Sequence, residues 1–258
     1  MSEQRVIAVC GKGGVGKTAF TAMLTKVLMD EVPGKLLVVD ADPALGLNYA
    51  IGRESEVTIG SIREMVLEKA EKGTKKDLEE LADSVEYLTA QALDEKEKFS
   101  FLAMGRMNTI GCFCSVNDLL KGAIENVMHS FDVVLIDGEA GLEQINRQVI
   151  EKIDTLILVT DTSFRGLQTV RHIKKMVDEG LVPACKNLGV VFNRAQSDVT
   201  SLKEFAEKEH INVIGSVPYD KQVEEFDLAG RPLLELPDNN KAVLAVKDCL
   251  KCAEEAVR

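Results

Sequence analysis

The chain has 258 residues, 45% of them hydrophobic, and a net charge of −11. This size suffices for one large hydrophobic core, and the acidic balance argues against a broad nucleic-acid-binding surface. No stretch approaches the roughly 18 uninterrupted apolar residues of a membrane-spanning helix, and the first strand leaves no room for a signal peptide. We therefore expect a single cytoplasmic domain over residues 1–258 that binds neither nucleic acid nor membranes.

The first predicted element is a short apolar strand, residues 5–10, which leads into a glycine-rich loop. The loop Gly11–Thr18 reads GKGGVGKT and fits the pattern G-x-x-x-x-G-K-[ST]. Apolar residues at helical spacing follow over residues 19–29. Backbone N–H groups of such a loop and of the helix N-terminus bind nucleotide phosphates. A chance glycine turn is disfavoured because strand, loop and helix stand in the required order.

The residues of this loop have distinct predicted roles. Lys17 would reach the β- and γ-phosphates of a nucleotide, and the Thr18 hydroxyl would ligate Mg²⁺. Lys12 is a second lysine, which the general pattern does not require. The other predicted nucleotide-binding positions in this part of the chain are Gly11, Gly13, Gly14, Val15, Gly16 and Ala19.

Strands and helices alternate along most of the remaining sequence. A capping box at Ser61–Glu64 predicts the start of a helix that runs to about Lys72, and a short added strand is predicted at 85–89. The alternation predicts an α/β fold in three layers, with helices on both faces of a mostly parallel sheet and ligands at the carboxyl ends of its strands. The later predicted strands cover residues 35–40, 131–137, 154–160, 188–193 and 211–217.

Three aspartates follow predicted strands that should end near the phosphates. Asp137 would hold Mg²⁺ through water, and Asp40 and Asp42 could both face the γ-phosphate. One of these two could order water on the metal while the other positions the attacking water. An aspartate at a strand end can also cap a turn, but three of them beside a phosphate loop favour a hydrolase.

A second feature is the sequence Cys112-Phe113-Cys114. In an extended segment both sulfurs would lie on the same side. Two thiolates from each of two chains would complete a four-ligand site for Zn²⁺, Ni²⁺ or an iron–sulfur cluster, although free cysteines are also common as small buried residues. Cys249 and Cys252 have a metal-ligand spacing, but they lie in a predicted helix over 240–256, which favours packing.

The loop and the sequence Asp40-Ala41-Asp42-Pro43 together resemble the deviant Walker A ATPases, which include the nitrogenase iron protein and the Min and Par partition ATPases. The resemblance covers nearly the whole chain and implies a catalytic set of Lys12, Lys17 and Asp42. In that class Lys12 crosses a dimer interface to the other subunit's ATP, and Asp42 orients the hydrolytic water. Two chains would then enclose two ATP molecules, and hydrolysis would loosen the pair.

The same resemblance places the base site at the ends of two later strands. Asn193 and Arg194 end one of them, and Pro218 and Tyr219 follow the other. An Asn amide can pair with N6 and N7 of adenine together. From composition alone, Asn193 is equally well explained as a turn residue.

Residues 111–120 and 139–144 resemble one branch of this class, the CooC-type maturation factors. These load nickel into carbon monoxide dehydrogenase, and the related AcsF type serves acetyl-CoA synthase. The resemblance implies a homodimeric ATPase in which Cys112 and Cys114 share Ni²⁺ or Zn²⁺ across the dimer. An iron–sulfur scaffold or carrier ATPase and a partition-type ATPase are the alternatives. The nearly neutral C-terminal helix and the net negative charge disfavour the partition type.

Overall fold

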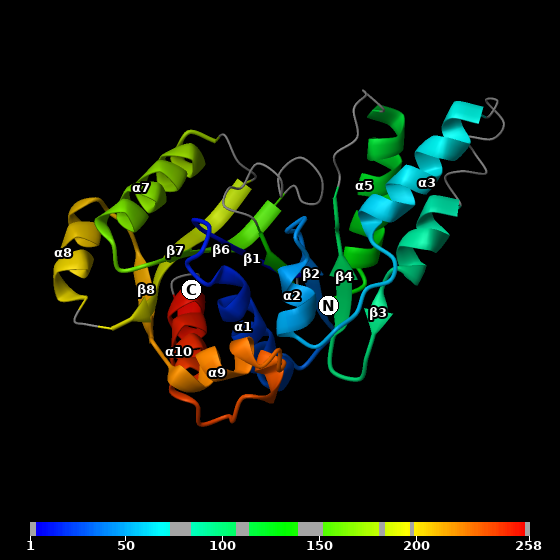
Figure 1. Ribbon diagram of the computed structural model, residues 1–258. Helices are drawn as coiled ribbons and strands as arrows, with labels where there is room; N and C mark the ends of the chain where they lie inside the picture. The colour runs from blue at the N-terminus through cyan, green and yellow to red at the C-terminus, as the bar shows by residue number, and fades with distance from the viewer. Residues whose placement is uncertain are drawn as a thin grey trace.

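An eight-stranded sheet runs through the centre of this computed structural model, which describes residues 4–72, 84–106, 114–138, 152–180, 184–196 and 199–255 (Figure 1). The strand order is β3-β4-β2-β5-β1-β6-β7-β8. All paired strands from β4 to β8 are parallel, and β3 is antiparallel to β4. The strands are β1 Arg5–Cys10, β2 Leu36–Asp40, β3 Asp94–Glu95, β4 Ser100–Ala103, β5 Val133–Asp137, β6 Lys152–Thr160, β7 Ala184–Ala195 and β8 Val213–Pro218.

Helices cover both faces of the sheet, which confirms the predicted three-layer α/β fold (Figure 1). One face carries α1 Lys17–Glu31, α2 Gly46–Ala50, α9 Lys221–Leu228, the 3₁₀ helix η1 Leu233–Glu235 and α10 Lys241–Glu255. The other face carries α3 Ile59–Lys72, a helix over residues 84–91, α5 Cys114–Met128, α7 Phe164–Asp178 and α8 Thr200–Lys208. Within the described residues, no helix is long and apolar enough to cross a membrane.

The first strand illustrates why helices pack on both faces. Val6, Ala8 and Cys10 belong to the core on the side of α3 and α5, whereas Ile7 and Val9 belong to the core on the side of α1. A strand that is apolar at every position is stable only when both of its faces are covered. The continuous apolar run therefore determines the central position of β1 in the sheet.

Two local predictions are wrong. The segment predicted as a strand at 85–89 is helical, because Val85 packs into the core in a helix over 84–91. The reciprocal cap of α3 is formed by Thr58 and Ser61, not by Ser61 and Glu64. The Thr58 hydroxyl accepts from the Ser61 N–H at 3.1 Å, and the Ser61 hydroxyl accepts from the Thr58 N–H at 3.0 Å. The helix thus begins at Ile59, earlier than predicted.

Candidate functional site

The glycine-rich loop joins β1 to α1 at the carboxyl end of the strand, as predicted. Its shape depends on glycine, as Gly11 and Gly16 illustrate. A Cβ atom at Gly11 would lie 2.0 Å from the carbonyl oxygen of Val159, so no larger residue fits there. Gly16 adopts a left-handed conformation, φ 84°, at the start of α1. The loop therefore presents its backbone N–H groups and the N-terminus of α1 to the same space.

A pocket of about 540 Å³ lies over this loop. Its floor includes Gly13, Gly16, Lys17 and Thr18, and Asp42 lies in its wall. Lys17 is only 8% exposed, and its ammonium group donates to the carbonyl oxygen of Lys12 at 3.5 Å. The Lys12 side chain belongs to an exposed residue. Lys17 thus lines the pocket of its own chain, whereas Lys12 is exposed and accessible to a second molecule.

Asp40 and Asp137 lie side by side at the ends of the adjacent strands β2 and β5, where they are register partners. Asp40 accepts from the backbone N–H groups of Asp42 and Leu47, each at 3.0 Å, and Asp137 accepts from the Thr21 hydroxyl at 2.8 Å. Burial, followed by the negative charge of Asp137, raises the pKa of Asp40 to about 7. These contacts hold two acidic groups together in a place where both are poorly hydrated.

The same cause acts on the second carboxyl group. Burial raises the pKa of Asp137 to about 6, while hydrogen bonds from Thr21 and Thr18 and the charge of Lys17 oppose the rise. Two buried carboxyl groups beside the Thr18 hydroxyl are the hard oxygen donors that Mg²⁺ prefers. The residues predicted to hold Mg²⁺ therefore fit that ion.

Asp42 is half-buried and lines the pocket over the glycine-rich loop, here called the phosphate pocket. Its carboxylate accepts from the Ala44 N–H at 2.9 Å, which fixes the turn after β2. The two interpretations of Asp42 are thus compatible. The side chain caps the turn after β2 and also lines the pocket in which the γ-phosphate is predicted to lie.

A second pocket, of about 270 Å³, adjoins the first and is here called the base pocket. Ala19 and Met23 of α1 line one side, and all four residues predicted to bind the base also line it, namely Asn193, Arg194, Pro218 and Tyr219. Arg194 lines both pockets, and it adopts the left-handed backbone conformation with φ 55°, which is uncommon for a residue other than glycine. The structure thus brings together two segments of chain that the sequence separates by more than twenty residues.

The side chain of Asn193 contacts the phosphate loop, which bears on its predicted pairing with adenine. Its side-chain nitrogen donates to the carbonyl oxygens of Val15, at 2.9 Å, and Gly16, at 3.3 Å. The side chain is buried, with an exposed fraction of 4%. The two-point pairing predicted with adenine needs this nitrogen, which the phosphate loop already engages. The side-chain oxygen is the other atom of this amide that can accept a hydrogen bond from a base.

Sequence reasoning missed the other wall of both pockets, which is formed by α9 and the residues that follow it. Asp227 lines both pockets, and Arg231 and Leu233 line the phosphate pocket. These residues follow the phosphate loop by more than 200 positions, so no local pattern connects them. Only the cap of α9 has a sequence signal, because Asp220 accepts from the N–H groups of Gln222 and Val223.

Part of the predicted thiolate site lies outside the described residues. Cys112 is not among them, nor are residues 139–144. Cys114 is the first residue of α5. In the described part of the chain, no group of three or more His, Cys, Asp or Glu residues could hold a metal ion. Cys249 is buried against Gly215, which agrees with packing.

Comparisons with known proteins place this arrangement among nucleotide-binding proteins. Residues 6–233 match the family described as CobQ/CobB/MinD/ParA nucleotide binding domain. An uncharacterized ATP-binding protein of Methanocaldococcus jannaschii is 39% identical over 247 residues, which cover 94% of this chain and 96% of that protein. The carbon monoxide dehydrogenase accessory protein CooC of Rhodospirillum rubrum is 30% identical over 243 residues, 89% of each chain.

Solved structures share the fold. The cell division ATPase MinD of Pyrococcus furiosus superposes with a TM-score of 0.68 at 21% identity, over 98% of this chain and 100% of that one. A ParA family ATPase of Chlorobium tepidum gives a TM-score of 0.68 at 18% identity, over 96% of this chain and 98% of that one.

Proposed function

Because the chain belongs to the CobQ/CobB/MinD/ParA nucleotide-binding domain family, we propose that it is a homodimeric ATPase whose nucleotide state controls a thiolate-bound metal. The cargo is nickel, delivered to carbon monoxide dehydrogenase or acetyl-CoA synthase. The observation that carries the ATPase part is the buried pair Asp40 and Asp137 beside Lys17 and the phosphate loop. Such a pair is costly without a cation, and a nucleotide brings Mg²⁺ to this place.

Each residue of the phosphate pocket has a role in hydrolysis. The N–H groups of the loop and Lys17 balance the charge that develops on the phosphate oxygens. Thr18 and Asp137, with Asp40 nearby, would hold Mg²⁺, which when bound neutralises phosphate charge. Asp42 accepts a hydrogen bond from the attacking water and orients it toward the γ-phosphate.

The assignment of Asp42 is tested by Asp42→Asn, which keeps the acceptor for the Ala44 N–H but removes the charge. ATP binding should persist, and the hydrolysis rate should fall by roughly a hundredfold. Unchanged hydrolysis would exclude Asp42 as the residue that orients water.

The dimer part of the proposal rests on Lys12, which is exposed and therefore free to reach a second chain. Lys12→Ala should retain ATP binding and lose ATP-driven dimerisation in size-exclusion chromatography. An ATP-dependent dimer in this variant would contradict the proposal that Lys12 crosses between subunits.

The metal part is supported by the similarity to CooC and by the position of Cys114. Helix α5 starts at Cys114 and follows β4, which is parallel to β2. The start of α5 therefore lies on the side of the sheet where the strands end, as does the phosphate loop (Figure 1). Nucleotide-dependent pairing of two chains on this side would bring two Cys112-Phe113-Cys114 segments together.

The metal site is tested with Cys112→Ser and Cys114→Ser, and with Cys252→Ser, an exposed cysteine in α10, as the matched control. The first two variants should lose stoichiometric Ni²⁺ binding, measured by equilibrium titration with and without ATP, while the control retains it. Retained binding in either test variant would refute the shared site. An absorbance band near 400 nm (roughly) in anaerobically purified protein would favour the iron–sulfur scaffold instead. ATP-dependent retention on DNA or liposomes would favour a partition-type ATPase.

A further inference from the structure

The wall of the nucleotide pockets that sequence reasoning missed is one continuous stretch of chain, residues 219–240, here called the clasp segment. It begins after β8, where the Tyr219 N–H donates to the Ala195 carbonyl oxygen at 3.0 Å, and it contains α9 and η1 before α10 begins at Lys241. Its residues line both the base pocket and the phosphate pocket, opposite α1 and the phosphate loop. A bound nucleotide would therefore be enclosed between the clasp segment and α1.

Apolar contacts hold the clasp segment on the body of the protein. Phe226, Leu233 and Leu236 are almost fully buried in the same core as Met23 and Val27 of α1. At its end, the buried Asn240 accepts from the N–H groups of Ala242 and Val243 and so caps α10. These contacts fix the clasp segment at its two ends and along one side.

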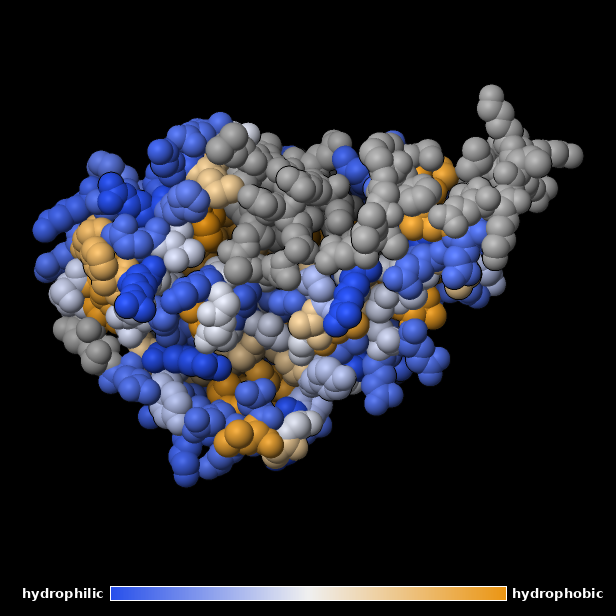
Figure 2. Space-filling view, turned by 45° about the horizontal axis from the view of Figure 1, so that its top comes forward, coloured by the Kyte–Doolittle hydropathy of each residue, from blue (hydrophilic) through white to orange (hydrophobic). Residues whose placement is uncertain are grey.

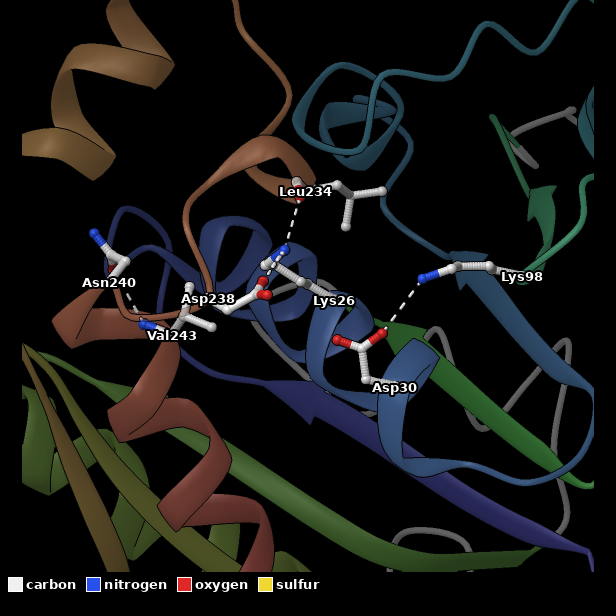
Figure 3. A network of polar contacts seen from close by, with 7 residues as sticks. All are labelled: Lys26, Asp30, Lys98, Leu234, Asp238, Asn240 and Val243. Atoms are coloured by element: carbon white, nitrogen blue, oxygen red, sulfur yellow. Dashed lines mark hydrogen bonds and ion pairs between the residues drawn. The ribbon is translucent and has the colours of Figure 1, made fainter.

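One polar contact crosses from α1 to the far end of the clasp segment. The Lys26 ammonium group lies 2.8 Å from the Asp238 carboxylate and donates to the Leu234 carbonyl oxygen at 3.3 Å (Figure 3). The Lys26 side chain is only 15% exposed, whereas its partner Asp238 is 86% exposed, so the poorly hydrated member of the pair is the lysine. A poorly hydrated ammonium group loses more when its partners leave than an exposed one does. This contact therefore resists separation of the clasp segment from α1.

The position of Lys26 on α1 connects this contact to the nucleotide. Lys26 follows Met23 by three residues, so the two side chains lie on neighbouring positions of one helix face. Met23 lines the base pocket. Met23, which lines the base pocket, and Lys26, which contacts the clasp segment beyond its pocket-lining residues, are thus about one helical turn apart on a helix that begins at the phosphate loop.

We propose that Lys26 is a positioning residue that holds the clasp segment closed over a bound nucleotide and so limits the rate of ADP release. The inference rests on the nucleotide site proposed above and adds a control on nucleotide exchange. Lys26 lines neither pocket, so it acts on the nucleotide through the clasp segment.

The experiment measures the release of radiolabelled ADP into excess unlabelled ADP, with Mg²⁺ present, for the full chain. Lys26→Met keeps the length of the side chain and removes its charge and donors. We expect ADP release to accelerate about five- to tenfold, the loss of one charge-assisted contact. The single-turnover rate at saturating ATP should change far less. Lys26→Arg should restore slow release, which a general packing defect would not.

Lys98→Met is the matched control. Lys98 also pairs with α1, through Asp30 at 3.4 Å, but both partners are exposed and neither belongs to the clasp segment (Figure 3). Its ADP release should equal that of the wild type. Release from Lys26→Met within twofold of the wild-type rate, at an unchanged melting temperature, would overturn the proposal. Failure of the wild type to bind ADP would instead refute the proposed function, and this inference with it.

Discussion

At the amino ends of the strands Asp132 and Asp154 each accept a hydrogen bond from a backbone N–H, whereas at the carboxyl ends Asp40 and Asp137 lie beside one another. Asp154 accepts from the Val6 N–H at 2.9 Å and forms an ion pair with Lys186 at 2.7 Å. Burial raises the pKa of both carboxyl groups at the carboxyl ends, and the negative charge of Asp137 raises the pKa of Asp40 further.

This difference shows that the role of an aspartate at a strand end depends on the groups that surround it. Asp154 and Asp137 are both buried, but Asp154 forms an ion pair with Lys186, whereas the charge of Lys17 only partly offsets the effect of burial on Asp137. The first arrangement stabilises the fold. The second retains a cost that a ligand can relieve, which is typical of a functional site. On the face that Figure 2 shows, the coloured residues are mostly hydrophilic, with separate hydrophobic patches among them.

The variant Asp137→Asn tests the proposed role of the carboxyl-end aspartates most directly. The variant keeps an oxygen that can accept from Thr21, but it loses the charge that would hold Mg²⁺. We expect ATP hydrolysis to fall by roughly a hundred- to a thousandfold, measured as phosphate release. The free protein should become more stable at pH 8, by about 1–2 kcal/mol, because one of two repelling charges is gone. Equal hydrolysis in wild type and variant would remove Asp137 from the site.

Asp154→Ala should have the opposite pattern. The substitution leaves the buried Val6 N–H without its acceptor and removes the ion pair with Lys186, so unfolding in urea should require about 2–4 kcal/mol less free energy. The hydrolysis rate of the folded protein should stay close to that of the wild type, because Asp154 lies at the other end of the strands. A large loss of hydrolysis without loss of stability would contradict the distinction between the amino-end and the carboxyl-end aspartates.

A pH series tests the carboxyl-end pair without mutation. The pKa values of Asp40 and Asp137 are about 7 and about 6 in the folded chain and 3.8 for the unperturbed group. The folded state therefore keeps protons that the unfolded state has lost. The free energy of unfolding of the free protein, measured in urea, should fall by several kcal/mol (roughly 4–7) as pH rises from about 4 to 7. Asp137→Asn should flatten this dependence.

The same pair links Mg²⁺ binding to pH. Mg²⁺ requires the ionised carboxylates, so the increase in melting temperature caused by Mg²⁺ with ADP should grow between about pH 5.5 and pH 8. ADP with a chelator in place of Mg²⁺ is the control. A Mg²⁺ effect that shrinks as pH rises would exclude these carboxylates as ligands.

The smallest effect is expected for Asp132→Ala. The carboxylate accepts from the Lys35 N–H at 2.8 Å in an exposed place, where water can replace it. The free energy of unfolding should fall by about 0.5–1.5 kcal/mol, with hydrolysis unchanged. A cost as large as that of Asp154→Ala would show that burial does not set the importance of these amino-end contacts.

The sequence predicted the parts of the molecule whose signals are local. Continuous apolar runs located β1, β2 and β5, and the glycine pattern located the phosphate loop, because both depend on neighbouring residues. The last two strands at one side of the sheet, β3 and β4, were not predicted. Asp94–Glu95 is short and polar, and Ser100–Ala103 has four residues, so neither has the length of a typical strand signal. The strand predicted at 85–89 failed because β-branched Val85 and Thr89 are buried on a helix, where packing outweighs propensity.

In the site, residue types were predictable and their contacts were not. Asp40, Asp42 and Asp137 were found because each follows a strand. The hydrogen bond from Asn193 to Val15 spans 178 residues, and the contact of Lys26 with Asp238 joins α1 to a segment near the other end of the chain. Such pairs depend on the order of strands in the sheet, which the sequence pattern alone does not determine.

The contact between Asn193 and the phosphate loop bears on how the protein would discriminate among nucleotides. The same amide that borders the base pocket fixes the carbonyl groups of Val15 and Gly16. A base that fits poorly and displaces Asn193 would therefore disturb the loop that positions the phosphates. Selectivity for the base should then affect the rate of the chemical step as well as the affinity, because the correct base keeps the phosphate loop aligned.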